Sequence, residues 1–290
     1  FDKDGNLLRW DGSPILLDNK IPRDPVVLEL LAKYRPAVEA LTNDIVGFSA
    51  VPLERKCTTT ECNIGNLITD AWVYNRVQQF QESSDSGSGW TDASLALVTG
   101  GAIRSSAAVG NISKFTLSTI IPFNNTLFVI RVPGKVLHAA LERCVQDYVV
   151  GNDVHASTLF QMSGARVVYD LHKMPGQRLQ SVEVLCSKCK IPSFEPLNEE
   201  RIYGVIIEEY IYKGIYKGEE GFTMFLPYKP ISMKMNSLEA VTNYIKHHGL
   251  IYPAIENRIK FVGHSESQAS TTSISVAVLA VVVLVSQLIQ

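Results

Sequence analysis

Several features that would assign a common function are missing from this sequence of 290 residues. The formal net charge is only −2, so no broad electrostatic field favours nucleic acid or an anionic membrane surface. The five cysteines include a single CxxC, Cys186–Cys189, whereas a zinc ribbon needs a second pair. No signal peptide is found at Phe1, and Phe1 is not a methionine. We therefore expect the chain to be the C-terminal part of a longer protein.

The remaining composition is that of a globular protein with a sizeable core, because 46% of the residues are hydrophobic. Apolar spacing and turn residues predict an α+β fold with mixed sheets and packed helices. Helices are expected over residues 25–41, 64–72, 115–120, 136–148 and 237–248. Strands are expected over residues 45–53, 95–99, 126–132, 160–170, 181–185 and 201–211. The first 20 residues contain Asp-Gly turns and predict a hairpin or a connector.

The cysteines favour an oxidising compartment. Cys57 lies close to Cys62, and Cys186 lies close to Cys189, so two short-range disulfides explain four of the five cysteines. Cys144 falls on the apolar face of the helix predicted over 136–148, where it is expected to be a buried small side chain and not a nucleophile. Two glycosylation sequons begin at Asn111 and Asn124, and both are compatible with secretion.

The most informative stretch runs from Leu95 to Arg104. An apolar run typical of a buried strand ends in Gly100 and Gly101, which allow a close backbone approach, and Arg104 then offers a guanidinium suited to phosphate or carboxylate. A second loop carries Phe123. We interpret the two loops as walls of a pocket for an anionic ligand; the alternative is a tight turn with a surface salt bridge.

Two polar pairs have less specific interpretations. Asn66 and Asp70 lie four residues apart on one flank of a predicted helix, where surface exposure or supporting hydrogen bonds is expected. His247 and His248 lie at the end of a helix, where a cation suits the helix dipole, and no carboxylate has the spacing to complete a metal site. No metal site is therefore expected in this chain.

The last 27 residues differ in kind from the rest. A small polar stretch over 265–273 precedes an almost wholly apolar segment over 274–289. Sixteen helical residues would span roughly 24 Å, which is short of a hydrocarbon core of about 30 Å. Small residues, a polar spacer and a short apolar tail are typical of a GPI-attachment signal, with Ser265 as the expected attachment residue and Gly263 or Ser267 as alternatives. A short tail anchor is the other interpretation.

In combination, the motifs resemble the C-terminal substrate-binding domain of ecto-5'-nucleotidases and of the related apyrases of blood-feeding arthropods. The matching segments occur in the family's order. They are 61–71 (ECNIGNLITDA), 100–104 (GGAIR), 121–123 (IPF), 168–170 (VYD), 186–189 (CSKC), 220–222 (EGF) and 251–260 (IYPAIENRIK).

This resemblance implies three regions. Residues 1–22 would be a connector from an N-terminal metallophosphoesterase domain that lies outside this chain, 23–263 the substrate-binding domain, and 264–290 the spacer and GPI signal. The longer protein would be a hydrolase of nucleotide catabolism. It would be anchored at the extracellular face of the plasma membrane, it would act on nucleoside 5'-phosphates, and it would form a homodimer in some members.

The resemblance also implies that catalysis belongs to the other domain, which would hold two divalent metal ions such as zinc. Asp153-Val-His155 matches one short metal motif of that domain, but no GNHE motif follows it. A two-metal hydrolase needs several converging ligands to activate water. We therefore expect the 290-residue chain to have no phosphatase activity by itself.

Residue by residue, the resemblance assigns ligand binding to Arg104, with Phe123 and Phe222 stacking on the two faces of the base, and assigns the disulfides Cys57–Cys62 and Cys186–Cys189. Two family contacts are changed, because threonine stands at Thr58 in place of arginine and at Thr99 in place of asparagine.

Three further family features are changed or missing. The family's ribose-binding aspartate has no equivalent near 226–228, and a Gly-Asp-Gly-Phe pattern has become 219–222 (EEGF). One family disulfide is missing at both of its ends. Arg55 or Lys56 could supply a replacement cation at the changed pocket. The alternative function is therefore a non-catalytic relative with an altered pocket that binds a nucleotide, a nucleoside or a protein.

Overall fold

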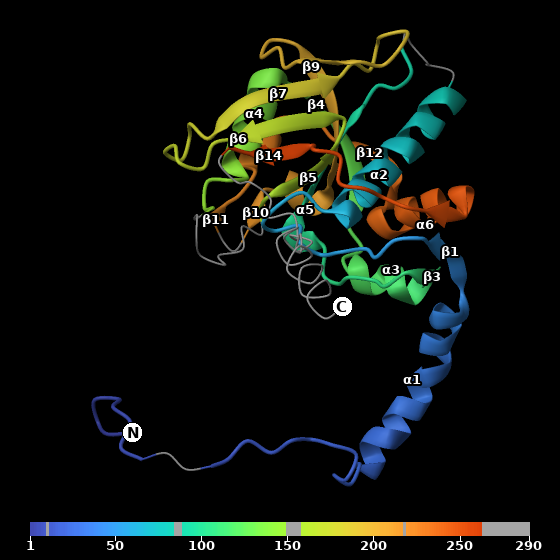
Figure 1. Cartoon of the computed structure of the whole chain (residues 1–290), viewed down its shortest axis with the longest axis vertical. Helices are drawn as coiled ribbons and strands as arrows, with labels where there is room; N and C mark the ends of the chain where they lie inside the picture. Colours follow the sequence, from blue (N-terminus) through green and yellow to red (C-terminus); the bar gives the residue numbers. More distant parts are fainter. Residues whose placement is uncertain (10–11, 84–88, 149–157, 217–218, 263–290) are drawn as a thin grey trace, which may run out of the picture.

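A computed structural model of the chain describes residues 1–9, 12–83, 89–148, 158–216 and 219–262. Figure 1 shows a folded body from which one helix, α1, extends away together with the N-terminal residues. Three mixed sheets, a two-stranded ribbon and six α-helices make up the described part of the chain. The predicted α+β class is therefore confirmed.

The α-helices and the two 3₁₀ turns have the following bounds: α1 Pro25–Asn43, α2 Asn63–Glu82, η1 Gly100–Ala102, α3 Lys114–Ile120, α4 Gly134–Arg143, α5 Glu209–Tyr212, η2 Thr223–Phe225 and α6 Ser237–His248. The strands have the following bounds: β1 Ile45–Ser49, β2 Leu95–Thr99, β3 Gly110–Ser113, β4 Thr126–Pro133, β5 Phe160–Ser163, β6 Ala165–Tyr169, β7 Leu179–Leu185, β8 Phe194–Pro196, β9 Ile202–Glu208, β10 Ile215–Tyr216, β11 Glu219–Glu220, β12 Ile231–Asn236, β13 Leu250–Ile251 and β14 Ile259–Phe261.

The central sheet has five strands in the order β12-β4-β9-β2-β5, and β2 lies between a parallel and an antiparallel neighbour. Every residue of β2 is buried, because the sheet separates two apolar cores. Leu95 and Leu97 point into the core that includes α4, whereas Ala96 and Val98 point into the core that includes α2 and α6. This burial on both faces explains the continuous apolar run of the strand.

Helix α2 is enclosed by its neighbours over most of its length, and only its C-terminal residues are exposed. Its residue Trp72 is 0% exposed and donates a hydrogen bond from Nε1 to Ser237 Oγ at 3.1 Å, at the start of α6. Asn236 and Glu239 form a capping box at the same end of α6. Buried side chains lie on several sides of α2, so the predicted single apolar face over 64–72 underestimates how deeply the helix is buried.

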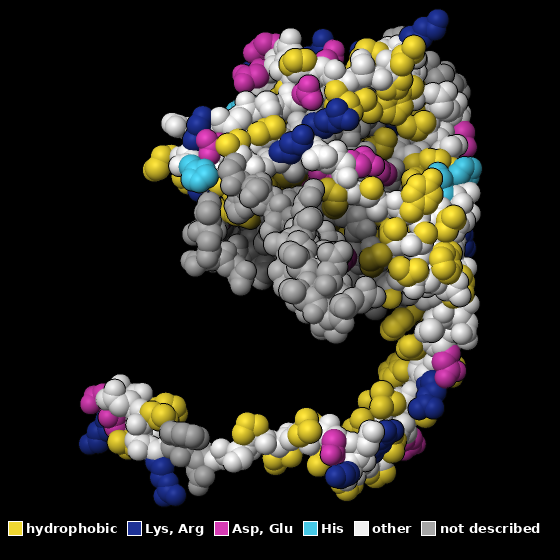
Figure 2. Space-filling model, in the orientation of Figure 1, with side chains coloured by type: hydrophobic (Ala, Val, Ile, Leu, Met, Phe, Trp, Pro, Cys, Tyr) yellow, Lys and Arg dark blue, Asp and Glu magenta, His cyan; other side chains and the backbone are white. Residues whose placement is uncertain are grey.

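Helix α1 has the predicted start, because the Asp24 side chain accepts hydrogen bonds from the backbone N–H groups of Val26 and Val27. None of its residues is buried, however, and its apolar residues are visible along the extended helix in Figure 2. They are Val27, Leu30, Leu31, Tyr34, Val38 and Leu41, each between 43% and 57% exposed. The apolar face predicted from the spacing therefore exists. Helix α1 contacts α3 and β3, but these contacts leave its apolar face exposed within the described residues.

The strand predicted over 160–170 is wrong as a single element. Gly164, with φ +73°, separates β5 from β6, and a Cβ at this position would lie 1.8 Å from the backbone oxygen of Ser94. Strand β5 pairs with β2, whereas β6 pairs with β7, so the two halves belong to different sheets. Because only one residue separates the two strands, the apolar pattern continues across the corner, and the sequence alone does not indicate the break.

Three other elements are shorter than predicted. The strand expected over 45–53 ends at Ser49, the helix expected over 136–148 ends at Arg143, and the strand expected over 201–211 ends at Glu208 and continues as α5. At least one apolar residue after each end stays buried: Leu53 in an isolated pair with Ala107, Val145 after α4, and Ile211 in α5. Burial thus continues where regular hydrogen bonding has stopped.

Two predictions fall on residues that the structure does not describe. The expected GPI signal, with Ser265 and its alternatives Gly263 and Ser267, lies in 263–290, and Asp153-Val-His155 lies in 149–157. Among the residues that are described, no helix is long and apolar enough to cross a membrane.

Candidate functional site

The glycine turn after β2 is pressed against the first disulfide loop. A Cβ at Gly100 would lie 2.1 Å from the Cys57 backbone oxygen and 3.0 Å from the Thr58 backbone nitrogen, so only glycine fits. The Gly100 N–H donates to the Leu159 oxygen at 2.7 Å, and the side chain of Ile103 is 0% exposed. The turn is thus fixed on both sides, and Arg104 directly after it reaches the surface.

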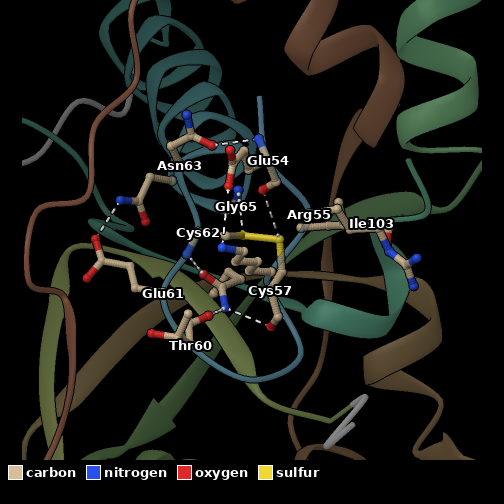
Figure 3. The surroundings of a disulfide bond; sticks show 12 residues. Glu54, Arg55, Cys57, Thr60, Glu61, Cys62, Asn63, Gly65 and Ile103 are labelled. Atoms are coloured by element: carbon tan, nitrogen blue, oxygen red, sulfur yellow. Dashed lines mark hydrogen bonds and ion pairs between the residues drawn. A yellow bond between two sulfur atoms is a disulfide. The ribbon is translucent and has the colours of Figure 1, made fainter. Parts of the chain in front are cut away.

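One buried glutamine forms hydrogen bonds with the backbone of the disulfide loop. Figure 3 shows Cys57 joined to Cys62, with an S–S distance of 2.01 Å. The Gln161 side chain, which is 0% exposed, donates to the backbone oxygens of Cys57 (2.9 Å) and Thr60 (2.8 Å) and accepts from the Cys62 N–H (2.9 Å). Three backbone groups of the loop therefore depend on a single side chain of β5.

Replacing Gln161 with alanine is expected to lower the free energy of unfolding by about 2 kcal/mol, because it removes the hydrogen-bond partner of two buried backbone groups and one partly buried backbone group. Urea denaturation of the wild type and the variant measures this change. Gln180→Ala is the matched control, because it removes a glutamine on β7 whose hydrogen bonds are local and are exposed or partly buried. Equal losses for the two variants would contradict the role given to Gln161.

Arg104 and Phe123 lie on neighbouring loops. The Arg104 backbone N–H donates to the Ile120 oxygen at 2.9 Å, at the end of α3 and three residues before Phe123. Phe123 is 45% exposed, and Ile121 beside it is buried and anchors the loop. Arg104 is also exposed, and its Nη1 donates to the Gly101 oxygen at 3.2 Å. The structure therefore places two neighbouring loops side by side, one with an exposed arginine and one with an exposed aromatic residue.

Thr99 and Phe222 lie elsewhere, in the core. Thr99 is 4% exposed and pairs with Phe160 across β2 and β5. The Phe222 ring is 3% exposed, and its centroid lies 4.5 Å from that of Phe160 and 6.3 Å from that of Phe225. Within the described residues no ring contact joins Phe222 to Phe123. The ring expected to stack on one face of a base is thus covered by neighbouring rings in this structure.

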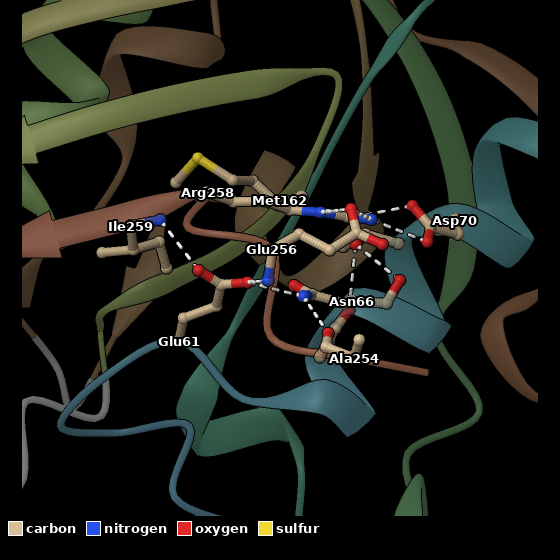
Figure 4. Close-up of polar contacts among 10 residues, drawn as sticks. Glu61, Asn66, Asp70, Met162, Ala254, Glu256, Arg258 and Ile259 are labelled. Carbon is tan, nitrogen blue, oxygen red and sulfur yellow. Dashed lines mark hydrogen bonds and ion pairs between the residues drawn. The ribbon is translucent and has the colours of Figure 1, made fainter. Parts of the chain in front are cut away.

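A buried polar network ties the end of the body to α2, as Figure 4 shows. Glu61, 4% exposed, accepts hydrogen bonds from the Asn66 side chain and from the backbone N–H groups of Glu256 and Ile259. Glu61 therefore connects the disulfide loop to the segment before β14.

Arg258 supplies the second half of this network. Its guanidinium, 10% exposed, forms two hydrogen bonds of 2.8 Å with Asp70 and contacts Glu256 and the Met162 oxygen. Burial alone would lower the pKa of Arg258, but the hydrogen bonds and charges of Asp70 and Glu256 raise it above its ordinary value.

The expectation of supporting hydrogen bonds at Asn66 and Asp70 is thereby confirmed. Sequence reasoning missed Glu61, Gln161 and Arg258. The available signal was that Glu61 and Arg258 lie in two of the segments that match the family, 61–71 and 251–260.

The other candidates have structural explanations. Cys144 is 0% exposed, and burial raises the pKa of its thiol to about 11, which confirms a buried side chain and not a nucleophile. His247 and His248 pack with Tyr74 and Tyr244. Across the described ranges no group of three or more histidine, cysteine, aspartate or glutamate side chains could hold a metal ion.

The structure also contains the second disulfide, Cys186–Cys189, at 2.03 Å, where Trp90 donates to the Cys186 backbone oxygen. Asn111 on β3 is exposed, and so is Asn124 before β4.

The arrangement as a whole is that of an α+β domain in which a glycine turn, a short disulfide loop and an aromatic loop meet at one surface. The fold matches the solved structure of a 5'-nucleotidase precursor from Thermus thermophilus, with a TM-score of 0.74 and 28% identity, over 91% of this chain and 49% of that one. A family model described as 5'-nucleotidase, C-terminal domain, matches residues 43–227. The chain belongs to this family.

Two relatives show how the chain relates to longer proteins. Protein 5NUC of Lutzomyia longipalpis is 40% identical over 267 residues, which are 89% of this chain and 45% of that protein. The 5'-nucleotidase of Bos taurus is 33% identical over 297 aligned positions, covering 99% of this chain and 49% of that protein. The chain therefore spans about half the length of these relatives.

Proposed function

We propose that this chain is the nucleotide-binding part of a longer 5'-nucleotidase-type hydrolase that dephosphorylates extracellular nucleoside 5'-phosphates. The observation that carries the proposal is the placement of Arg104 and Phe123 on adjacent loops, joined by the hydrogen bond from the Arg104 N–H to the Ile120 oxygen. A guanidinium suits a phosphate, and an aromatic ring suits a base. Relatives of this chain that are named 5'-nucleotidase and apyrase support this assignment.

In this proposal the chemistry belongs to the part of the protein outside this chain, with two divalent metal ions such as zinc. Residues 1–22 are the connector, and the exposed apolar face of α1 packs against that part. Residues 23–263 are the binding domain. The segment 264–290 directs attachment of a GPI anchor at Ser265, glycans are attached at Asn111 and Asn124, and the protein lies at the extracellular face of the plasma membrane. A homodimer is part of the same proposal.

The second candidate function is that of a non-catalytic relative that binds a nucleotide, a nucleoside or a protein. The observation that favours it is the chemistry at two positions that bind the ligand in the family. Thr58 carries no charge where the resemblance expects arginine, and Thr99, which stands in place of asparagine, is buried. The sequence upstream of Phe1 separates the two candidates. Intact metal ligands there support the hydrolase, and their loss supports the binding protein.

Calorimetry with AMP and adenosine tests the binding surface. Arg104→Ala is expected to weaken AMP binding about tenfold while leaving adenosine unchanged, because it removes one charge-assisted contact of about 1.5 kcal/mol. Phe123→Ala is expected to weaken both ligands about tenfold, since stacking contributes roughly 1–3 kcal/mol per base.

Phe115→Ala is the matched control, because Phe115 is a half-exposed aromatic residue on α3 that does not belong to the proposed binding surface. The proposal fails if the wild type binds neither ligand, or if neither Arg104→Ala nor Phe123→Ala changes binding. Phe222→Ala is a poorer first test, because the burial of Phe222 means that its loss would also cost stability.

A further inference from the structure

We propose that Arg55 is a second anion-binding side chain of this surface, which acts together with Arg104 on the phosphate of the ligand. The inference rests on the proposed function, and it adds a residue that neither the motifs nor the comparisons assign. It starts from the contacts of Arg55 with the segment that carries Arg104.

Arg55 is fixed to that segment at two points. Its backbone N–H donates to Ser106 Oγ at 3.0 Å, and its Nε donates to the Ile103 oxygen at 2.7 Å. Figure 3 shows the Arg55 side chain extending away from the disulfide to Ile103. The Arg104 Nη1 donates to the Gly101 oxygen, so both guanidinium groups hydrogen-bond to the short stretch of backbone from Gly101 to Ile103. A hydrogen bond through Nε also fixes the plane of the guanidinium, which orients its two Nη groups.

Neither arginine is neutralised by a carboxylate in the described part of the chain. Their hydrogen bonds go to backbone and hydroxyl oxygens, and none of the ion pairs found there includes Arg55 or Arg104. Arg258, by contrast, contacts two carboxylates. Two neighbouring positive charges repel each other, and a bound anion removes that repulsion while accepting hydrogen bonds from both Nη pairs. The pair of arginines therefore favours a phosphate over an uncharged ligand.

Lys56 does not have this role. Its ammonium lies 3.9 Å from the Glu54 carboxylate, and its side chain is 75% exposed. No hydrogen bond ties it to the segment that carries Arg104 within the described ranges. Of the two cations in front of the first disulfide cysteine, the structure assigns the anion contact to Arg55, and Lys56 is a matched control one residue away.

The test is calorimetry of the 290-residue chain with AMP and adenosine as probes. Arg55→Gln is expected to weaken AMP binding about tenfold and to leave adenosine binding unchanged, whereas Lys56→Gln is expected to change neither. Arg55→Lys keeps the charge but loses the planar fork, so an intermediate loss for AMP is expected. Melting temperatures of all variants show whether the loop remains folded.

The outcomes separate this inference from the function on which it rests. If the wild type binds neither probe, both proposals fail. If Arg104→Ala weakens AMP binding and Arg55→Gln does not, only the role of Arg55 is overturned. If Arg55→Gln weakens AMP and adenosine equally, or Lys56→Gln matches its effect, Arg55 supports the loop or contributes general charge, and the inference is again overturned.

Discussion

Replacing Arg258 with methionine is expected to lower the free energy of unfolding by about 3 kcal/mol. The guanidinium is 10% exposed, and its loss leaves Asp70 without its bidentate partner and the Met162 oxygen without a donor. Removing one partner of a buried ion pair typically costs about 3–5 kcal/mol, since the remaining charge stays desolvated. The Asp70 and Glu256 side chains are 32% and 53% exposed, so the expected loss of stability lies at the lower end of this range.

Denaturation in urea at neutral pH measures this change, and Arg201→Met provides the control. Arg201 also pairs with a glutamate, Glu195, but its side chain is 51% exposed. Exposed pairs of this kind contribute about 0–1 kcal/mol, so the control should lose little stability. A similar loss for Arg258→Met and Arg201→Met would show that the network in Figure 4 does not stabilise the fold.

This network explains why the closing segment matters to the candidate site. Glu61, in the disulfide loop, accepts from the backbone of Glu256 and Ile259, and Arg258 between them holds α2 through Asp70. The loop that presses on Gly100 is therefore supported by Gln161 on one side and by residues near the end of the folded body on the other. Contacts between residues far apart in the sequence thus position the surface.

The parts of this arrangement that could be predicted are those determined by local pattern. The run from Leu95 to Thr99 predicted a buried strand, and Gly100 with Gly101 predicted a close backbone approach, because these features depend on adjacent residues. The resemblance added the pairing of Cys57 with Cys62, and the structure contains that bond. Local pattern and ordered motifs thus identified the turn, the disulfide loop and the class of fold.

The parts that could not be predicted depend on distant neighbours. The apolar spacing of α1 shows a face but cannot show whether anything covers it. Phe222 follows a glycine in a predicted loop, as an exposed ligand contact would, yet Phe160 on a distant strand packs against its ring. Gln161 lies in an apolar strand, and its partners are about 100 residues away. In each case the exposure of the side chain depends on residues that are distant in the sequence, so the local sequence does not predict it.

Glu208 is expected to make the stability of the protein fall as the pH rises from about 4.5 to about 7. The side chain is 1% exposed, its Oε2 accepts a 3.5 Å hydrogen bond from Asn125, and its Oε1 has no hydrogen-bond partner among the described residues. Asn125 and the Ser237 hydroxyl both lower the pKa of Glu208, but by less than burial raises it. Burial raises the pKa of Glu208 from 4.5 to about 7. Between these values the folded chain holds a proton that the unfolded chain has released, so unfolding becomes more favourable with each increment of pH.

Glu208→Gln removes this titration while keeping the shape of the side chain. Each pH unit in the interval corresponds to about 1.4 kcal/mol, so about 3 kcal/mol of wild-type stability is lost by about pH 8, and the variant keeps it. Urea denaturation at about pH 4.5 and about pH 8 should therefore show a smaller difference for the variant than for the wild type. Glu183→Gln, which removes an exposed glutamate of β7, controls for the change in net charge. If Glu208→Gln and the wild type lose the same stability over this range, the carboxyl group of Glu208 is not responsible, because the variant has no titrating group at that position.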